Sequence, residues 1–503
     1  MNRKAIKVAL MIVAALAVAL TTSAVMASTK AKTELPEYVG SKACLGCHAD
    51  EFLMWEPSGH ANMLTQVMKP TDLPGDPKAA PAEIKAELDK ADWIVAGHRF
   101  LARDPATGEL KYLNVQWDDA SKAYVAYKGG ASWNQGCAGC HTTGYDKASA
   151  TFADAGIGCE MCHGPGRDHI LGKGDVSKIT ATTDAQVCGS CHNGTSQMPD
   201  GTRWPVGYRP GQGNFTDGGF TYLKFDISKS AVDYTGKKLR QYAQWEASAH
   251  ATSWPTLQSN PAAGSYCYKC HTADAIVEGA TFDPAKHQGS VSSVTCVACH
   301  DPHGSSVEGQ LRKEPKALCE SCHNGSIAEG GTFKAGSEIH HPMKEMLGGY
   351  GAIGVAQTKG AHSGESFDGT EITCLSCHFA YNNHDFKVVT PADAMRTNAA
   401  YDSCTKCHTN SSSESRGVFL EMMQESVETK LHALTADIAT IDAALKANAN
   451  VLGAKLEAYQ AAKTNVSFVE ADASRGAHNF EYATKVLSAA QKAIADAKTA
   501  LPK

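Results

Sequence analysis

The chain has 503 residues, of which 43% are hydrophobic, 7% aromatic and 20% charged, and its formal net charge is −6. This length allows two to four domains, and the apolar content excludes a disordered tail. With 53 acidic and 47 basic residues, the chain lacks the cationic surplus that phosphate binding requires, so we expect no nucleic-acid partner.

The first residues have the pattern of a secretory signal peptide. Three basic residues precede an apolar run at 8–20, and the small residues at 25–27 supply a cleavage site. We therefore expect residues 1–27 to be removed on export. The alternative is an uncleaved anchor helix, although the run is shorter than the roughly 20 residues that span a bilayer. No later segment is apolar enough to cross a membrane, so we expect no transmembrane segment after cleavage.

A Cys-x-x-Cys-His motif occurs nine times and uses all 18 cysteines. The copies are Cys44-Cys47-His48, Cys137-Cys140-His141, Cys159-Cys162-His163, Cys188-Cys191-His192, Cys267-Cys270-His271, Cys296-Cys299-His300, Cys319-Cys322-His323, Cys374-Cys377-His378 and Cys404-Cys407-His408. Two thiols at this spacing form thioether bonds to a haem, and the imidazole that follows binds its iron. Zinc ribbons and thioredoxin-like sites do not explain a histidine after every second cysteine. The sequence therefore predicts nine covalently bound haem c groups and no disulfides.

The motifs divide the mature chain into two haem-binding parts. Four lie in residues 28–235, which we predict to be an N-terminal four-haem domain, and five lie in residues 236–412, a five-haem domain. Between the first and second motifs, residues 93–128 alternate Val, Tyr and Trp around Asp and Gly turns, which predicts a small strand pair or meander. The many Gly and Pro residues elsewhere indicate short helices and loops. The predicted fold class is mainly α with many loops.

The two haem-binding parts contain an internal repeat. Trp55 to His60 matches Trp245 to His250, and each copy is followed by three haem motifs, which begin at Cys137 and Cys267. Self-similarity of this kind indicates a duplicated structural unit. We interpret it as a duplicated three-haem module, with one further haem before the first copy and two after the second.

The last part, residues 413–503, is rich in Ala, Lys, Glu and Leu. Val427, Leu431 and Leu434 recur at helical spacing, so we predict a helical hairpin or bundle of two or three long helices. We expect breaks near Asn450 and around Asn465. The same pattern would also allow two chains to form a homodimer through these helices.

Twelve histidines lie outside the motifs and are candidates for the second, distal side of each iron, where a neutral imidazole gives a six-coordinate iron suited to electron transfer. We predict seven distal ligands: His60, His169, His250, His303, His362, His384 and His478. For His287 and His340, the sequence does not decide between a distal ligand and an ordinary side chain. His98 lies in the strand-like insertion and His432 in the C-terminal helical part, where ordinary surface or core histidines are more common, so we do not assign them as ligands. The first four motifs have few local candidates, so one of their irons is open unless a distant histidine reaches it.

Residues 38–194 resemble the tetrahaem cytochrome c554 group. The likeness rests on Tyr38-Val39-Gly40-Ser41, the Trp55 to His60 pattern, Cys-His-Thr-Thr-Gly-Tyr at 140–145 and Cys-Glu-Met-Cys-His-Gly-Pro-Gly at 159–166. That group has one five-coordinate haem at its second motif. The resemblance implies an open haem on His141.

Residues 240–490 are similar in motif order to the five-haem core of ammonia-forming nitrite reductases and octahaem hydroxylamine oxidoreductases. The resemblance puts the haem on His271 in the place of their catalytic haem, with His341-Pro342 where the nitrite reductases keep an active-site histidine. It also matches His362 and His478 to axial ligands. Nitrite reductases, however, place Lys where this chain has His271, and Asn324-Gly325-Ser326 lacks their active-site Tyr.

The nine-haem total with this core also resembles the outer cell-wall nonahaem cytochromes of metal-respiring Gram-positive bacteria. This resemblance implies an extracytoplasmic electron-transfer protein, at the cell surface, in the cell wall or in the periplasm. Its partners would be donor cytochromes or a quinol-linked membrane complex, and extracellular acceptors such as ferric minerals, humics or an electrode. The alternative is a reductase of nitrite, hydroxylamine or tetrathionate at an open haem, on His271 with His341 nearby or on His141. Whether the chain is an enzyme stays open.

Overall fold

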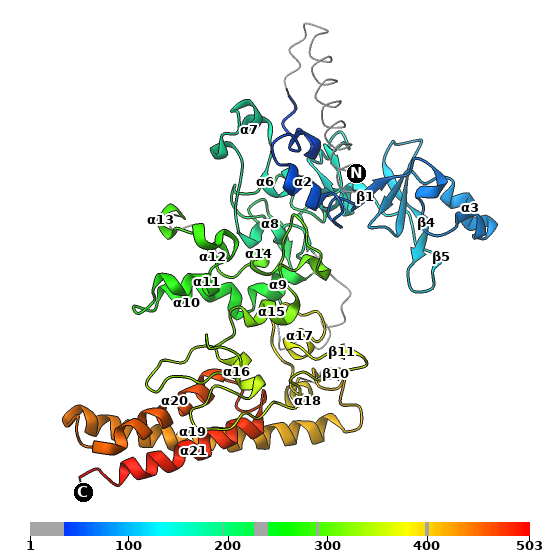
Figure 1. Cartoon of the computed structure of the whole chain (residues 1–503). Helices are drawn as coiled ribbons and strands as arrows, with labels where there is room; N and C mark the ends of the chain where they lie inside the picture. The colour runs from blue at the N-terminus through cyan, green and yellow to red at the C-terminus, as the bar shows by residue number, and fades with distance from the viewer. Residues whose placement is uncertain (1–34, 195, 226–239, 288–290, 398–401, 503) are drawn as a thin grey trace, which may run out of the picture.

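A computed structural model describes residues 35–194, 196–225, 240–287, 291–397 and 402–502. The predicted signal peptide and the boundary between the two predicted haem-binding domains lie outside these residues. The described chain is elongated and helix-rich, with small sheets and long C-terminal helices (Figure 1). Within the described ranges, no helix is both long and apolar enough to cross a membrane. The fold class predicted from the sequence is therefore confirmed.

Most helices of the haem-binding parts are only one or two turns long. In the N-terminal part they are α2 (Ala49–Trp55), α3 (Ala82–Leu88), α4 (Trp133–Gly136), α5 (Ala138–His141), α6 (Cys159–His163), α7 (Arg167–Leu171) and α8 (Ala185–Gly189). The middle part contains α9 (Gln241–Glu246), α10 (Ser253–Gln258), α11 (Tyr268–His271), α12 (Ala273–Glu278), α13 (Pro284–His287), α14 (Cys296–Cys299), α15 (Pro315–Glu320), α16 (Met343–Gly348), α17 (Cys374–His378) and α18 (Pro391–Arg396). Three two-residue strand pairs connect loops: β6 (Thr142–Thr143) with β7 (Asp154–Ala155), β8 (Ser196–Gln197) with β9 (Thr221–Tyr222), and β10 (Ser366–Phe367) with β11 (Thr370–Glu371).

The insertion before the second motif forms a five-stranded antiparallel meander at the side of the molecule (Figure 1). Its strands are β1 (Leu64–Gln66), β2 (Trp93–Val95), β3 (Arg99–Arg103), β4 (Leu110–Asp118) and β5 (Ala123–Ala126). The predicted meander is confirmed, with one more strand at its start. One face of the sheet packs Leu101 and Tyr112 against Trp133 and Ala138, which belong to α4 and α5. The sheet therefore covers the motif of His141.

The C-terminal part is a bundle of three helices, α19 (Ser413–Ala447), α20 (Leu456–Asp472) and α21 (Phe480–Lys498), at the end of the molecule opposite α2 (Figure 1). The Ser412 hydroxyl caps α19 by accepting a hydrogen bond from the Ser415 N–H at 3.1 Å. The helices bury a continuous apolar core that includes Val427 of α19, Phe468 of α20 and Leu487 of α21. This burial stabilises the bundle.

One predicted helix break is confirmed and the other is wrong. The chain leaves α19 just before Asn450, but Asn465 lies inside α20 and is buried. Its side-chain amide donates to the Ile353 carbonyl at 3.0 Å and its oxygen accepts from the Ile353 N–H at 2.8 Å. These contacts satisfy the polar side chain, so the helix continues through it. His478 lies in the turn between α20 and α21.

Candidate functional site

The nine Cys-x-x-Cys-His motifs lie in short turns or one- to two-turn helices, and several of their histidines are oriented by the backbone. The Nδ1 atoms of His163, His300 and His378 lie 2.7, 2.6 and 2.9 Å from the carbonyl oxygens of Thr180, Gly309 and Phe386. A carbonyl at Nδ1 fixes the proton there and leaves Nε2 free to bind a metal. These three histidines therefore have the hydrogen bond at Nδ1 that metal-bound histidines have.

Eight of the nine motif histidines face a second imidazole at the separation that one iron requires. A metal–imidazole bond is about 2 Å long, and the ring centroid lies about 1 Å beyond the bonded nitrogen, so two rings on opposite sides of one iron have centroids about 6 Å apart. The pairs are His48–His169 (6.3 Å), His60–His192 (6.3 Å), His163–His303 (6.0 Å), His250–His323 (6.2 Å), His271–His340 (6.1 Å), His300–His384 (6.4 Å), His362–His408 (5.9 Å) and His378–His478 (6.2 Å). The gap between the rings of each pair fits one planar metal group.

All seven histidines predicted as distal ligands belong to these pairs. The eighth, His340, could not be singled out from the sequence, where it stands beside His341 in an irregular segment. Three candidates are elsewhere: His287 contacts Asp274 at 3.5 Å and Glu278 at 3.0 Å, while His98 and His432 are in none of the pairs. Local sequence proximity does not predict the partner, because His169 faces His48 and not the adjacent His163.

The pairing follows a repeating rule along the chain. His169, His303 and His384, which come three to six residues after a motif, each face the histidine of an earlier motif: His48, His163 and His300. A second series, His60, His250 and His362, faces the later motif histidines His192, His323 and His408. His303 thus connects the two haem-binding parts by reaching back to His163.

The duplicated Trp-x-x-Ser-x-His pattern has the same function in both copies. The Trp55 indole donates to the Ile157 carbonyl at 2.8 Å, and the Trp245 indole donates to the Val294 carbonyl at 2.8 Å. Each acceptor is two residues before the second motif of its own copy. The two copies of the pattern therefore make equivalent hydrogen bonds.

Burial favours the neutral form of three of these rings, His192, His323 and His384. Desolvation lowers the pKa of His192, His323 and His384 to about 4. His478 differs, because burial alone would lower its pKa but the Asp472 carboxylate, 2.7 Å from its Nδ1, raises it. A neutral imidazole is the form that binds iron, and a carboxylate at Nδ1 makes it a stronger ligand.

The motif of His141 is the exception. Among the residues that the structure describes, no imidazole lies at the ring separation of the eight pairs from His141. Its nearest ring is the Trp133 indole, with centroids 5.7 Å apart, and, beyond the effect of burial, His98 lies close enough to lower the pKa of His141. Arg99, on β3, lies near this motif, with its guanidinium 4.9 Å from the centre of the Tyr127 ring. Arg99 Nε, Trp133 Nε1 and Tyr145 OH are buried without a hydrogen-bond partner in the described part of the chain. The sheet contributes one of these three atoms, Arg99 Nε, and the segments on either side of the motif contribute the other two.

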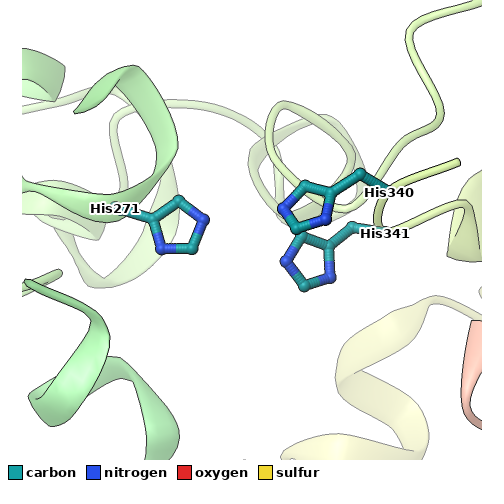
Figure 2. Close-up of side chains that lie close together, drawn as sticks. All are labelled: His271, His340 and His341. Atoms are coloured by element: carbon teal, nitrogen blue, oxygen red, sulfur yellow. The ribbon is translucent and has the colours of Figure 1, made fainter. Parts of the chain in front are cut away.

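The motif of His271 faces two histidines instead of one (Figure 2). The ring centroids of His340 and His341 are each 6.1 Å from that of His271. Figure 2 shows the two rings on the same side, both across a gap from His271. Both imidazoles are within ligand distance of an iron bound to His271.

Contacts between cysteines show which motifs are neighbours. Thiols of different motifs lie close enough to perturb each other's pKa at Cys44–Cys159, Cys140–Cys191, Cys188–Cys296, Cys270–Cys322 and Cys319–Cys374. Cys162 also lies near Cys188, Cys299 near Cys322, and Cys377 near Cys407. These sulfur atoms are thioethers once haem is attached, so each contact marks two adjacent attachment sites. Together they order the motifs as a trunk, with its histidines in the order His48, His163, His192, His300, His323, His378 and His408, and with His141 and His271 on side branches.

Comparisons with known proteins agree with this geometry. Residues 360–503 match the cytochrome c552 family, residues 287–328 the doubled CXXCH motif, and residues 108–164 the cytochrome c554 and c-prime family. The crystal structure of outer cell wall cytochrome OcwA is 30% identical, with a TM-score of 0.75 over 91% of this chain and 100% of that one. The chain is a multihaem c-type cytochrome. It belongs to the same family as OcwA, and covalently bound haem c and electron transfer follow from that membership.

Two further relatives have a more limited likeness to this cytochrome. The undecahaem cytochrome from the S-layer of Carboxydothermus ferrireducens is 23% identical, with a TM-score of 0.60 over 93% of this chain and 70% of that one, and shares the fold. Multiheme cytochrome MtrA of Shewanella baltica (strain OS185) is 25% identical over 178 residues, which are 34% of this chain. The matched segment spans 43% of the MtrA length.

Proposed function

We propose that this cytochrome binds nine haems and conducts electrons along its trunk between a donor at one end and an extracellular acceptor at the other. The observation that carries the proposal is the unbroken series of neighbouring cysteines from the motif of His48 to that of His408. Each bound haem supplies a one-electron iron couple. The paired histidines hold these couples six-coordinate, and the short motif helices keep neighbouring attachment sites adjacent.

The location proposed for the protein is outside the cytoplasm, at the cell surface or in the cell wall or periplasm. The signal-peptide pattern of residues 1–27 supports export, and OcwA is by its name an outer cell wall cytochrome. Donor cytochromes or a quinol-linked membrane complex would supply electrons. Ferric minerals, humics or an electrode would accept them, because a chain of many exposed couples requires no dedicated substrate pocket. A homodimer through the C-terminal helices is part of the same proposal.

A break in the middle of the trunk tests conduction. The double substitution Cys296→Ala and Cys299→Ala removes one attachment site between those of His192 and His323. The reduced protein is immobilised on an electrode through a C-terminal tag, and the charge released is followed in time. We expect the haems of His271, His323, His378 and His408 to discharge fast and those on the far side of the break to discharge slowly.

The matched control is Cys137→Ala with Cys140→Ala, which removes the branch site of His141 and leaves the trunk intact. This variant should release the charge of its eight remaining haems in one fast phase. Mass spectrometry of the intact protein counts the covalent haem additions in each variant. A trunk variant that discharges all its remaining haems as fast as the branch variant would refute the proposal.

A second candidate function is reduction of a small nitrogen or sulfur oxo-compound at an open iron. The observation in its favour is the absence, in the described residues, of an imidazole opposite His141. The site on His271 is the weaker candidate, because two imidazoles already face it. Arg99 would attract an anion to the His141 site.

Spin state tests this second function. An iron without a sixth protein ligand gives a high-spin EPR signal when oxidised, and we expect one such signal per nine haems in the wild-type protein. Azide should convert it to a low-spin signal, and Arg99→Gln should weaken azide binding by about tenfold, equivalent to about 1.4 kcal/mol. An entirely low-spin spectrum would eliminate the reductase.

A further inference from the structure

Six of the eight paired motif histidines face a single imidazole. His323 lies near two, His250 and His341, whereas His271 faces two that are consecutive in the chain (Figure 2). The centroids of the His340 and His341 rings are 3.9 Å apart and equally distant, 6.1 Å, from the centroid of His271. One ligand nitrogen from each of the three residues lies within 4.8 Å of the other two. Distance therefore favours neither residue as the ligand opposite His271.

The segment that carries the two histidines is fixed on both sides. Ile339 before them and Pro342 after them are buried. On the N-terminal side, the Gly336 N–H donates to the Thr464 hydroxyl of α20 at 2.9 Å. On the C-terminal side, the Lys344 N–H donates to the carbonyl of His323 at 3.2 Å. Both rings therefore lie on a short segment between two anchored positions, within reach of His271.

The backbone at the tip has an unusual conformation. His341 has a φ of +49°, in the left-handed region that side chains other than glycine seldom adopt. Such strain persists where the surrounding structure imposes it, and it is concentrated at ligand clamps and active sites. Here the strained residue, His341, is one of two successive histidines whose rings lie on the same side of His271.

We propose that His340 and His341 are alternative sixth ligands of the iron bound by His271, and that this iron exchanges one for the other. An iron has one position opposite His271, so the two rings cannot both occupy it. His341 also lies 5.7 Å from His323, but that histidine already faces His250 at 6.2 Å. The exchangeable pair keeps this branch iron six-coordinate in either state. The inference rests on the haem attachment proposed above.

Three variants of the full-length holoprotein test the exchange: His340→Ala, His341→Ala and the double variant. Oxidised protein is examined by EPR for high-spin signals in addition to the one expected from the His141 site. We expect each single variant to keep this iron low-spin, because the remaining histidine takes the position. The double variant should gain one high-spin signal and bind one additional azide. In the wild-type protein, two low-spin species should be present, and each single variant should keep one of them.

Two substitutions serve as controls. His60→Ala removes the only ring opposite His192 in the described chain and should give one new high-spin signal. This signal would show that the assay detects the loss of one sixth ligand. His432→Ala on α19 should change nothing. A new high-spin signal in either single variant would overturn the exchange, and so would a double variant that stays low-spin. Mass spectrometry counts haem additions in every variant, so a missing haem at Cys267 and Cys270 shows failure of attachment and not of exchange.

Discussion

The contact between Asp472 and His478 predicts a specific change in one reduction potential. Asp472 Oδ1 lies 2.7 Å from His478 Nδ1, and the side chain of Asp472 is 1% exposed. A buried anion at Nδ1 stabilises the ferric iron opposite His378 more than the ferrous iron. Asp472→Asn keeps an acceptor oxygen and removes the charge. We therefore expect the potential of this haem to rise.

The size of the change follows from hydrogen-bond energies. A hydrogen bond to a charged group contributes about 1.5–3 kcal/mol and a neutral one about 1 kcal/mol, a difference of about 0.5–2 kcal/mol. For one electron this corresponds to roughly 20–90 mV. Redox titration in an optically transparent cell, as a difference between variant and wild type, measures it. The control is Asp442→Asn, which removes a carboxylate that accepts from Tyr459 in the same bundle at 2.7 Å. An unchanged set of potentials in a fully low-spin His378 site would refute the reasoning.

Further predictions concern single side chains. His303→Ala should open the iron of His163, in the other haem-binding part, and give one new high-spin EPR signal, whereas His432→Ala should not. The buried Glu160 carboxylate accepts from three backbone N–H groups, so Glu160→Gln should destabilise the fold by on the order of 2 kcal/mol, seen as a lower calorimetric midpoint. Burial raises the pKa of Glu345, so the fold favours its protonated form and loses stability as pH rises above the unfolded pKa. Glu345→Gln should therefore raise the thermal midpoint at pH 8 and barely change it at pH 4; an equal change at both would contradict this.

The motifs made most of the attachment chemistry predictable, because thiol spacing is a local property of the sequence. The meander and the break near Asn450 were predictable for the same reason, from periodicity and turn residues. The error at Asn465 came from a contact with Ile353, which lies far away in the chain. No local pattern encodes such a contact.

The sequence predicted seven of the histidines that lie in pairs, but it did not predict which motif histidine each one faces. The seven predicted distal histidines could be chosen by their repeats and surroundings, but their partners could not, since His169 and His303 each bypass the nearest motif. His340 gave no signal, because its role depends on the strained turn at His341. The open haem on His141 stays a prediction, made from a shortage of local histidines and from family resemblance. The sheet that surrounds this motif was predicted only as strands.

The backward reach of His169, His303, His384 and His478 has a consequence for biogenesis. A chain that is exported from its N-terminus presents each of these four ligands only after one to three further motifs have emerged. A chain that ends before His478 therefore leaves at least one motif histidine without its opposite imidazole.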